Sequence, residues 1–191
     1  MPWNSALHIF EPLAVIKMKH FNTILYKVLS PKNVGMIIRS HVAFGGDKIV
    51  FVGYDKPWDF KKGSQAFSRK LESECKFLHF KNEIDFFKWS KREGIMNYAV
   101  EINEEATVLS ETKFAPISNL IVGSEKLGLP ADFVTQCDNV IVIPQFGQVE
   151  CLNVSISSSI AMYEFRRNDK MTLGITKSKF ETKRKQTANN V

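Results

Sequence analysis

The sequence, 191 residues long, predicts an α/β fold with a mainly parallel sheet flanked by helices. Short apolar runs alternate along the chain with segments whose apolar residues fall at helical spacing. Gly and Pro bound the runs, and this alternation is typical of parallel strands that helices cover on both faces. The 15 Phe, 3 Trp and 4 Tyr residues supply the apolar area of a packed core, which argues against wholesale disorder.

Strands are expected where an apolar run meets a turn residue. The first run stops before Ser30-Pro31, the run KIVFVG ends in Gly53, and the run NVIVI stops at Pro144. Proline lacks a backbone N–H donor, and glycine allows backbone conformations that other residues disfavour, so both residues commonly end a strand. The expected strands span residues 21–29, 48–53, 75–80, 97–102, 119–122 and 139–143.

Helices are expected between these runs. Val34, Ile37, Ile38 and Val42 recur at helical spacing, and two glycines follow them, as glycine often follows the end of a helix. The polar residues 54–64 are expected to form a loop. The expected helices span residues 34–44, 65–73, 83–92, 130–136 and 152–167.

The net charge of +6 lies at one end of the chain. Residues 166–191 hold eight basic and two acidic side chains, whereas the preceding residues hold equal numbers of both. A neutral body with a cationic tail fits a polyanionic partner, nucleic acid ahead of a membrane; a solvated tail without a partner is the alternative. The sequence thus predicts a short extension (1–20), a main domain (21–168) and a basic, disordered tail (169–191).

Several classes of protein are not expected. No apolar run approaches the roughly 20 residues that span a bilayer, and residues 1–20 lack the apolar stretch of a signal peptide. Cys75, Cys137 and Cys151 are odd in number, widely spaced and form no CxxC pair. We therefore expect no disulfide scaffold, no metal and no membrane attachment, and a cytoplasmic location.

Ligands of parallel sheets bind at loops beyond the carboxyl ends of the strands, and the first such segment reads SPKNVGMIIR (30–39). Asn33 is expected to cap the helix, and Gly35 allows another backbone to approach closely. Arg39 is either a surface ion-pair residue or a functional cation. By themselves, these three residues do not identify a function.

The second and third segments follow later strands. In GSEKLGLP (123–130), Gly123 would let a ligand lie against the backbone, and Glu125 is either a hydrogen-bond acceptor for a ligand or a carboxylate at a helix N-terminus. In IPQFGQVECLNVS (143–155), Asn153 and Ser155 suit a helix start that faces a ligand, and a plain serine-rich helix start is the alternative.

Together the three segments resemble, in order and approximate separation, the three motifs of the SPOUT-class RNA 2′-O-ribose methyltransferases of the SpoU/TrmH type. The matches are N-V-G-x-I-x-R at 33–39, V-G-S-E-x-x-G-L at 122–129 and I-P-x-x-G-x-V-x-x-L-N-V-S at 143–155. The resemblance covers roughly residues 22–167.

The resemblance implies an α/β domain with a C-terminal deep trefoil knot, a rare exception to the rule that chains do not thread. It also implies S-adenosyl-L-methionine bound in the knot, a homodimer through the knot region, and tRNA or rRNA as substrate. By resemblance the catalytic residues are Arg39, Asn33 and Glu125. The cofactor-binding residues are Val100, Val122, Gly123, Glu125, Gly128, Ile143, Gln145, Gly147, Cys151, Leu152 and Asn153.

The implied reaction is the in-line attack of a ribose 2′-hydroxyl on the sulfonium methyl group, for which alignment is the main requirement. Because a guanidinium is always charged, we expect Arg39 to anchor a phosphate and stabilise the developing alkoxide rather than act as a base. The short segment before the first strand is too small for the N-terminal substrate-binding domain of many members, so RNA recognition is expected from the dimer surface and the tail.

Three residues depart from the family pattern. Cys151 stands where the family commonly has Ser, Gln145 where it has Met, and Arg167 where it has Gln. The leading hypothesis is a methyltransferase of RNA ribose. A catalytically inactive RNA-binding relative and a doubly wound α/β enzyme of another chemistry, such as nucleotide binding, are the alternatives.

Overall fold

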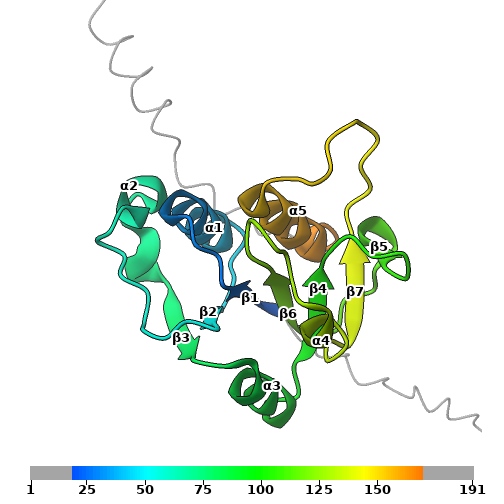
Figure 1. Ribbon diagram of the computed structural model, residues 1–191, viewed down its shortest axis with the longest axis horizontal. Coiled ribbons are helices and arrows are strands. Elements are labelled where there is room, and N and C mark those ends of the chain that lie inside the picture. The colour runs from blue at the N-terminus through cyan, green and yellow to red at the C-terminus, as the bar shows by residue number, and fades with distance from the viewer. Residues whose placement is uncertain (1–18, 170–191) are drawn as a thin grey trace, which may run out of the picture.

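Seven parallel strands form one sheet in the order β3-β2-β1-β6-β4-β7-β5 (Figure 1). The computed structural model describes residues 19–169. The strands are β1 (His20–Tyr26), β2 (Lys48–Val52), β3 (Lys76–Phe80), β4 (Met96–Val100), β5 (Thr107–Val108), β6 (Ile117–Val122) and β7 (Asn139–Val142). The chain builds one half of the sheet outward from β1 and then crosses to the other half.

Helices cover both faces of the sheet, and each face has its own apolar core. The α-helices are α1 (Pro31–Ala43), α2 (Ser64–Ser68), α3 (Glu83–Arg92), α4 (Ala131–Val134) and α5 (Val154–Arg166), and the 3-10 helices are η1 (Leu71–Glu74) and η2 (Leu109–Glu111). Phe21 and Leu25 of β1 pack in the core of α1 and α5, whereas Ile24 and Tyr26 pack with Phe86 of α3 on the opposite face. This alternation is that of a strand buried on both sides.

Helices α1 and α5 run parallel to each other on one face of the sheet. Asn33 bonds Asn153 near the start of both helices, and the Ser40 and Ser159 hydroxyl oxygens lie 2.7 Å apart farther along. Gly35 of α1 faces the backbone of α2, where any side chain at that position would clash with the Ser64 carbonyl oxygen. The predicted close approach at Gly35 is thus confirmed.

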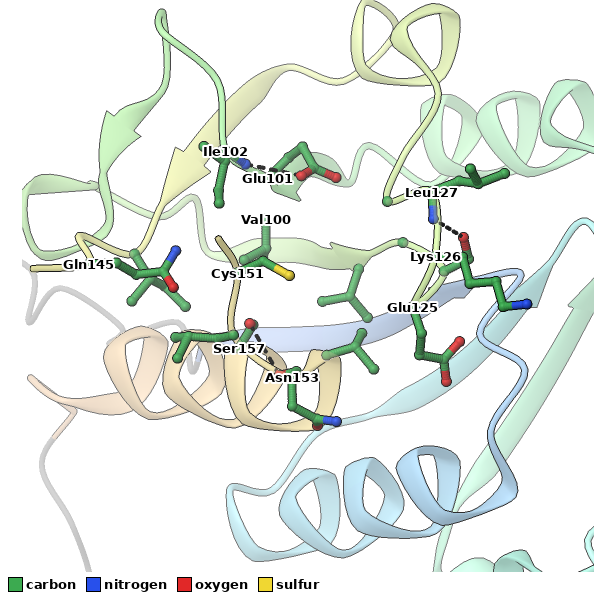
Figure 2. Close-up of a pocket in the computed structure, with 17 residues that line it drawn as sticks. Val100, Glu101, Ile102, Glu125, Lys126, Leu127, Gln145, Cys151, Asn153 and Ser157 are labelled. Atoms are coloured by element: carbon green, nitrogen blue, oxygen red, sulfur yellow. Dashed lines mark hydrogen bonds between the residues drawn. The ribbon is translucent and has the colours of Figure 1, made fainter. Parts of the chain in front are cut away.

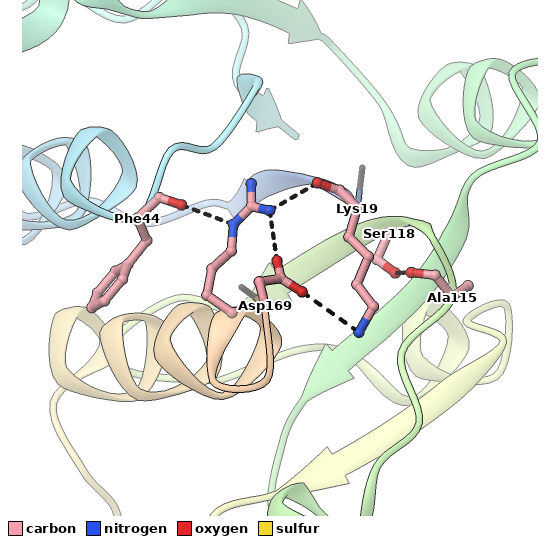
Figure 3. A network of polar contacts seen from close by, with 6 residues as sticks. Lys19, Phe44, Ala115, Ser118 and Asp169 are labelled. Atoms are coloured by element: carbon pink, nitrogen blue, oxygen red, sulfur yellow. Dashed lines mark hydrogen bonds and ion pairs between the residues drawn. The ribbon is translucent and has the colours of Figure 1, made fainter. Parts of the chain in front are cut away.

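Arg166 ties the end of α5 to the end of α1 (Figure 3). Its guanidinium donates to the carbonyl oxygens of Phe44 (3.0 Å), Gly45 (2.8 Å) and Lys19 (2.8 Å), and to the Asp169 carboxylate (2.9 Å). The Arg166 side chain is 24% exposed. A charged donor that satisfies backbone carbonyls left over at a helix end stabilises that end.

His41, in the last turn of α1, is buried against the ring of Phe21, which the Arg166 guanidinium also contacts. Its Nδ1 lies 2.8 Å from the Thr23 hydroxyl oxygen, and its ring occupies the space that a side chain at Gly46 would need. Burial lowers the pKa of His41 to about 4, against an opposing effect of the Asp47 carboxylate. The imidazole is therefore neutral at physiological pH.

Three asparagines form a buried ladder across the middle of the sheet. Asn22, Asn119 and Asn97 are register partners on β1, β6 and β4. Asn22 Nδ2 donates to Asn119 Oδ1 (2.9 Å), and Asn119 Nδ2 donates to Asn97 Oδ1 (2.8 Å) and to the hydroxyl oxygen of Ser90 on α3 (3.1 Å). All four residues are buried, so these hydrogen bonds replace water, whereas Asn22 Oδ1 has no hydrogen-bond partner within residues 19–169.

The predicted α/β class with a parallel sheet flanked by helices is confirmed, and most elements match within a few residues. The expected helix 65–73 instead divides into α2 and η1, because Arg69 and Lys70 adopt positive φ angles. The two-residue strand β5 was not predicted. The predicted extension and tail lie outside the described residues, apart from residues 19, 20 and 169.

Candidate functional site

A cavity of about 430 Å³ opens at the carboxyl ends of β4, β6 and β7, beside the start of α5 (Figure 2). Its volume lies within the range of small-molecule sites, and its position is the one that parallel sheets use for ligands. The lining residues are Val100, Glu101, Ile102, Val122, Gly123, Ser124, Glu125, Lys126, Leu127, Gly128, Ile143, Gln145, Cys151, Leu152, Asn153, Val154 and Ser157.

The loop after β6 forms one wall of the cavity. Ser124 and Gly128 exchange two backbone hydrogen bonds, of 3.2 and 3.0 Å, which turn the loop back on itself. Gly123 faces this turn, and a Cβ atom there would clash with the backbone of Gly128, which itself has a φ of +61°. Glu101 braces the turn by accepting from the Leu129 N–H (2.9 Å). Packing at Gly123 and the backbone angle at Gly128 thus require both glycines.

Glu125 links this loop to the start of α1. Its Oε2 accepts from the Leu29 N–H (2.9 Å), and its Oε1 accepts from the Ser30 N–H (2.9 Å) and from Asn33 Nδ2 (2.8 Å). Partial burial alone raises the pKa of Glu125, but these donors outweigh burial and hold the pKa below its usual value. Glu125 is therefore a carboxylate at neutral pH, located at a helix N-terminus.

Asn33 extends the link to the third segment. Its Oδ1 accepts from Asn153 Nδ2 (3.1 Å), and Asn153 Oδ1 in turn accepts from the Ser155 backbone N–H (2.9 Å) and hydroxyl (2.6 Å). Asn153 is the N-cap of α5, which agrees with the prediction that it lies at a helix start, although the helix was expected to begin at residue 152. The chain Glu125–Asn33–Asn153–Ser155 therefore joins all three motif segments beside the cavity.

The prediction that Asn33 caps α1 is wrong. Ser30 is the N-cap, and its hydroxyl oxygen accepts from the Asn33 N–H at 3.4 Å. Pro31 occupies the first helical position, where its fixed φ is favourable and its missing N–H has no consequence. Asn33 is therefore inside the first turn, and its side chain is directed at Glu125 and Asn153 rather than at its own helix.

Arg39 does not line the cavity. It lies on the exposed stripe of α1 with Lys32 and Met36, which share one face of the helix at spacings of four and seven residues. Within residues 19–169 its guanidinium has no hydrogen bond or ion pair, and α1 contains no acidic residue. The surface ion pair that was one interpretation of Arg39 is absent there, and the cation faces outward.

All but one of the cofactor-binding residues implied by the resemblance line the cavity. Gly147 is exposed and does not line it. Gln145 is half-buried, and its Oε1 has no hydrogen-bond partner in the described part of the chain. The resemblance did not name the remaining lining residues as cofactor-binding. They are Ser124, Lys126, Leu127 and Val154, which lie in the second and third motif segments, and Glu101, Ile102 and Ser157, which lie outside all three segments. A carboxylate directly after β4 is the signal that could have found Glu101.

Within residues 19–169, no group of three His, Cys, Asp or Glu side chains is arranged to hold a metal ion. No helix in that range is both long and apolar enough to cross a bilayer.

The model of the SpoU rRNA Methylase family matches residues 20–163. The chain is 30% identical over 148 residues to the 23S rRNA (guanosine-2′-O-)-methyltransferase RlmB of Coxiella burnetii, a match that covers 75% of this chain and 57% of that relative. It is 25% identical to the tRNA (guanosine(18)-2′-O)-methyltransferase of Thermus thermophilus, over 75% of this chain and 73% of that one.

The crystal structure of the AdoMet-bound rRNA methyltransferase from Sinorhizobium meliloti has the same fold, with a TM-score of 0.74 and 24% identity. The superposition covers 80% of this chain and 57% of that one. The chain thus spans a little over half the length of the Coxiella and Sinorhizobium proteins. Because the family model matches most of the residues, a range that includes all three motifs, the chain belongs to the SpoU rRNA methylase family.

Proposed function

We propose that this chain transfers a methyl group from S-adenosyl-L-methionine to a ribose 2′-hydroxyl of tRNA or rRNA. The observation that carries the proposal is the hydrogen-bonded chain from Glu125 through Asn33 to Asn153, which joins the start of α1 to the two segments that line the cavity. The relatives named as 2′-O-methyltransferases of rRNA and tRNA support this reaction. The cytoplasm is the location we propose with it.

The cavity residues fit an adenosyl ligand. Val100, Ile143 and Leu152 supply apolar walls for a flat base, and Gly123 leaves the loop backbone open to a ligand. The buried Gln145 Oε1, which has no partner in residues 19–169, is an acceptor for a polar edge of that base. When bound, S-adenosylmethionine supplies a methyl group activated by a positively charged sulfur.

The protein contributes to the reaction mainly by aligning the reacting groups. In our proposal Arg39 holds an RNA phosphate near the ribose and stabilises negative charge as the 2′-hydroxyl releases its proton to solvent water. A guanidinium does not release its proton at physiological pH, so Arg39 acts as a cation and not as a base. Both oxygens of Glu125 already accept hydrogen bonds, so Glu125 positions the start of α1 relative to the cavity.

We also propose the C-terminal trefoil knot and a homodimer through that region. Apolar side chains are exposed there, with Phe146 at 98%, Ile156 at 45% and Tyr163 at 55%. Large exposed apolar groups on adjacent segments favour a protein partner. A second copy would cover α5, and it would also bring a second exposed Arg39 to the assembly.

Transfer of tritiated methyl groups to unmodified tRNA and rRNA tests the function. We expect wild type to label one of these RNAs, and Arg39→Ala to lower kcat/KM at least about 100-fold, because it removes a charge that stabilises the transition state. Arg92→Ala is the matched control, since Arg92 is an exposed arginine on α3, across the sheet from α1.

Binding of S-adenosylhomocysteine, measured by calorimetry, is expected to be equal in wild type and both variants. Binding of S-adenosylhomocysteine and RNA without methyl transfer by wild type would identify the inactive relative instead. Binding of ATP or NAD but not of S-adenosylhomocysteine would identify an enzyme of another chemistry.

A further inference from the structure

We propose that the side-chain amide of Gln145 recognises the amino-substituted edge of the cofactor's adenine. The inference rests on the proposed function, because it assigns the orientation of S-adenosylmethionine in the cavity. It concerns a residue in which this chain departs from the pattern described above, where methionine commonly follows the Ile-Pro pair. A methionine thioether is a weak acceptor and no donor, so this contact is specific to a chain with an amide here.

The first observation is an unsatisfied polar atom. Gln145 Oε1 is buried, and neither it nor Nε2 makes a hydrogen bond within residues 19–169. A buried acceptor without a partner is unfavourable, so such atoms in folded proteins are usually paired with protein, water or ligand. Because Gln145 lines the cavity, a ligand in the cavity can supply the missing partner.

The second observation is the division of the cavity into two ends. Figure 2 shows Gln145 on the side of Ile102 and Val100, whereas Glu125 and Lys126 lie on the other side. Val100 and Ile102 at the Gln145 end suit the faces of a base, and Glu101 beside them uses its carboxylate oxygens on the Ile102 and Leu129 N–H groups. The polar end contains the Glu125 carboxylate and borders the link to Asn33, on the helix that carries Arg39. Adenine at the Gln145 end therefore directs the reactive sulfur toward the end nearer α1.

The third argument is chemical complementarity. A primary amide presents one acceptor and two donors, and a glutamine amide pairs in bidentate fashion with the N6 amino group and N7 acceptor of adenine. Oε1 would accept from the amino group while Nε2 donates to the ring nitrogen. The amide thus satisfies both of its own groups and selects a base with an amino substituent.

Calorimetry with two ligands tests the contact directly. The ligands are S-adenosylhomocysteine and its analogue in which hydrogen replaces the 6-amino group. We expect wild type to bind S-adenosylhomocysteine about fivefold more tightly than the analogue, since one net hydrogen bond contributes about 1 kcal/mol. Gln145→Met should lose this preference and bind both ligands more weakly, because the analogue keeps the ring nitrogen to which Nε2 donates.

Two further variants complete the design. Gln148→Met places the same change on an exposed residue of the same loop and should bind both ligands as wild type does. Gln145→Glu retains the acceptor and should retain a preference for the amino group, which tests the contact independently if the methionine variant is misfolded.

The outcomes separate this inference from the proposed function. A Gln145→Met protein that binds S-adenosylhomocysteine and discriminates as wild type does would overturn the adenine contact and leave the function standing. A wild-type protein that binds neither ligand would overturn the function, and the contact with it.

Discussion

The two ends of the α1–α5 pair are both held by polar side chains, but in different ways. At the pocket end, Glu125, Asn33 and Asn153 join three segments, and Glu125 and Asn153 are exposed. At the opposite end, which we call the anchor end, the Arg166 guanidinium donates to three backbone carbonyl oxygens and one carboxylate. The pocket end keeps polar atoms accessible beside a cavity, whereas the anchor end uses its donors on the fold itself. Similar hydrogen bonding therefore joins segments beside a cavity at one end and holds the helix ends together at the other.

The largest expected effect is a loss of stability at the anchor end. Arg166→Met removes the charged donor and leaves the carbonyls at the end of α1 without a partner, so we expect the free energy of unfolding to fall by about 3 kcal/mol. Urea unfolding measures this. Arg167→Met is the adjacent control, since Arg167 is exposed and pairs only with Glu164 among the described residues, and it should change stability by less than about 0.5 kcal/mol. A larger effect on S-adenosylhomocysteine affinity than on stability would contradict the division between the ends.

The next effect is a pH dependence that also belongs to the anchor end. Because burial lowers the pKa of His41 to about 4, the unfolded chain takes up a proton below pH 6.5 that the folded chain refuses until about pH 4. Stability should therefore fall as pH falls through this window, by about 2 kcal/mol between pH 7.5 and 5. In His41→Gln this part of the slope should vanish. A slope that survives the substitution would assign it to other groups.

The Glu125 carboxylate should affect stability at a lower pH than His41 does. Its pKa is below the ordinary value of 4.5, so its contribution to stability is present above that pH and is lost as pH falls further.

The smallest stability effect is expected at the pocket end. Asn33→Ala removes one of three hydrogen bonds to Glu125 and the acceptor of Asn153, both of which water can replace, so stability should fall by only about 1 kcal/mol. Methyl transfer should fall at least about tenfold, because the three segments are no longer fixed relative to one another. Ser40→Ala, which removes the bond to Ser159 in the middle of the pair, should leave transfer unchanged. Equal losses of transfer in both variants would show that the pocket end has no special role.

Sequence patterns predicted the features that depend on local periodicity and turn residues. The helix at 83–92 was predicted with its observed bounds, and Asn153 was predicted at a helix start, because both follow local rules. The predicted cap at Asn33 was wrong, since the pattern does not show that Pro31 takes the first helical position and leaves Ser30 as the cap. The anchor was not predicted, because the targets of Arg166 are backbone carbonyls of distant residues, which have no signature in a sequence. The pairing of Asn33 with Asn153 likewise depends on the parallel packing of α1 and α5.

The buried asparagines of the sheet have a consequence for how the strands find their partners. If β1 or β4 slipped by one residue against β6, the Asn119 amide would face Phe21 or Thr23 on one side, or Met96 or Tyr98 on the other. Each such slip would leave a primary amide dehydrated and unmatched in the interior, a large penalty for a misaligned state. Strands rich in Ile, Leu and Val have many alignments of nearly equal energy. The hydrogen bonds between the asparagine amides favour the observed alignment over those slipped by one residue.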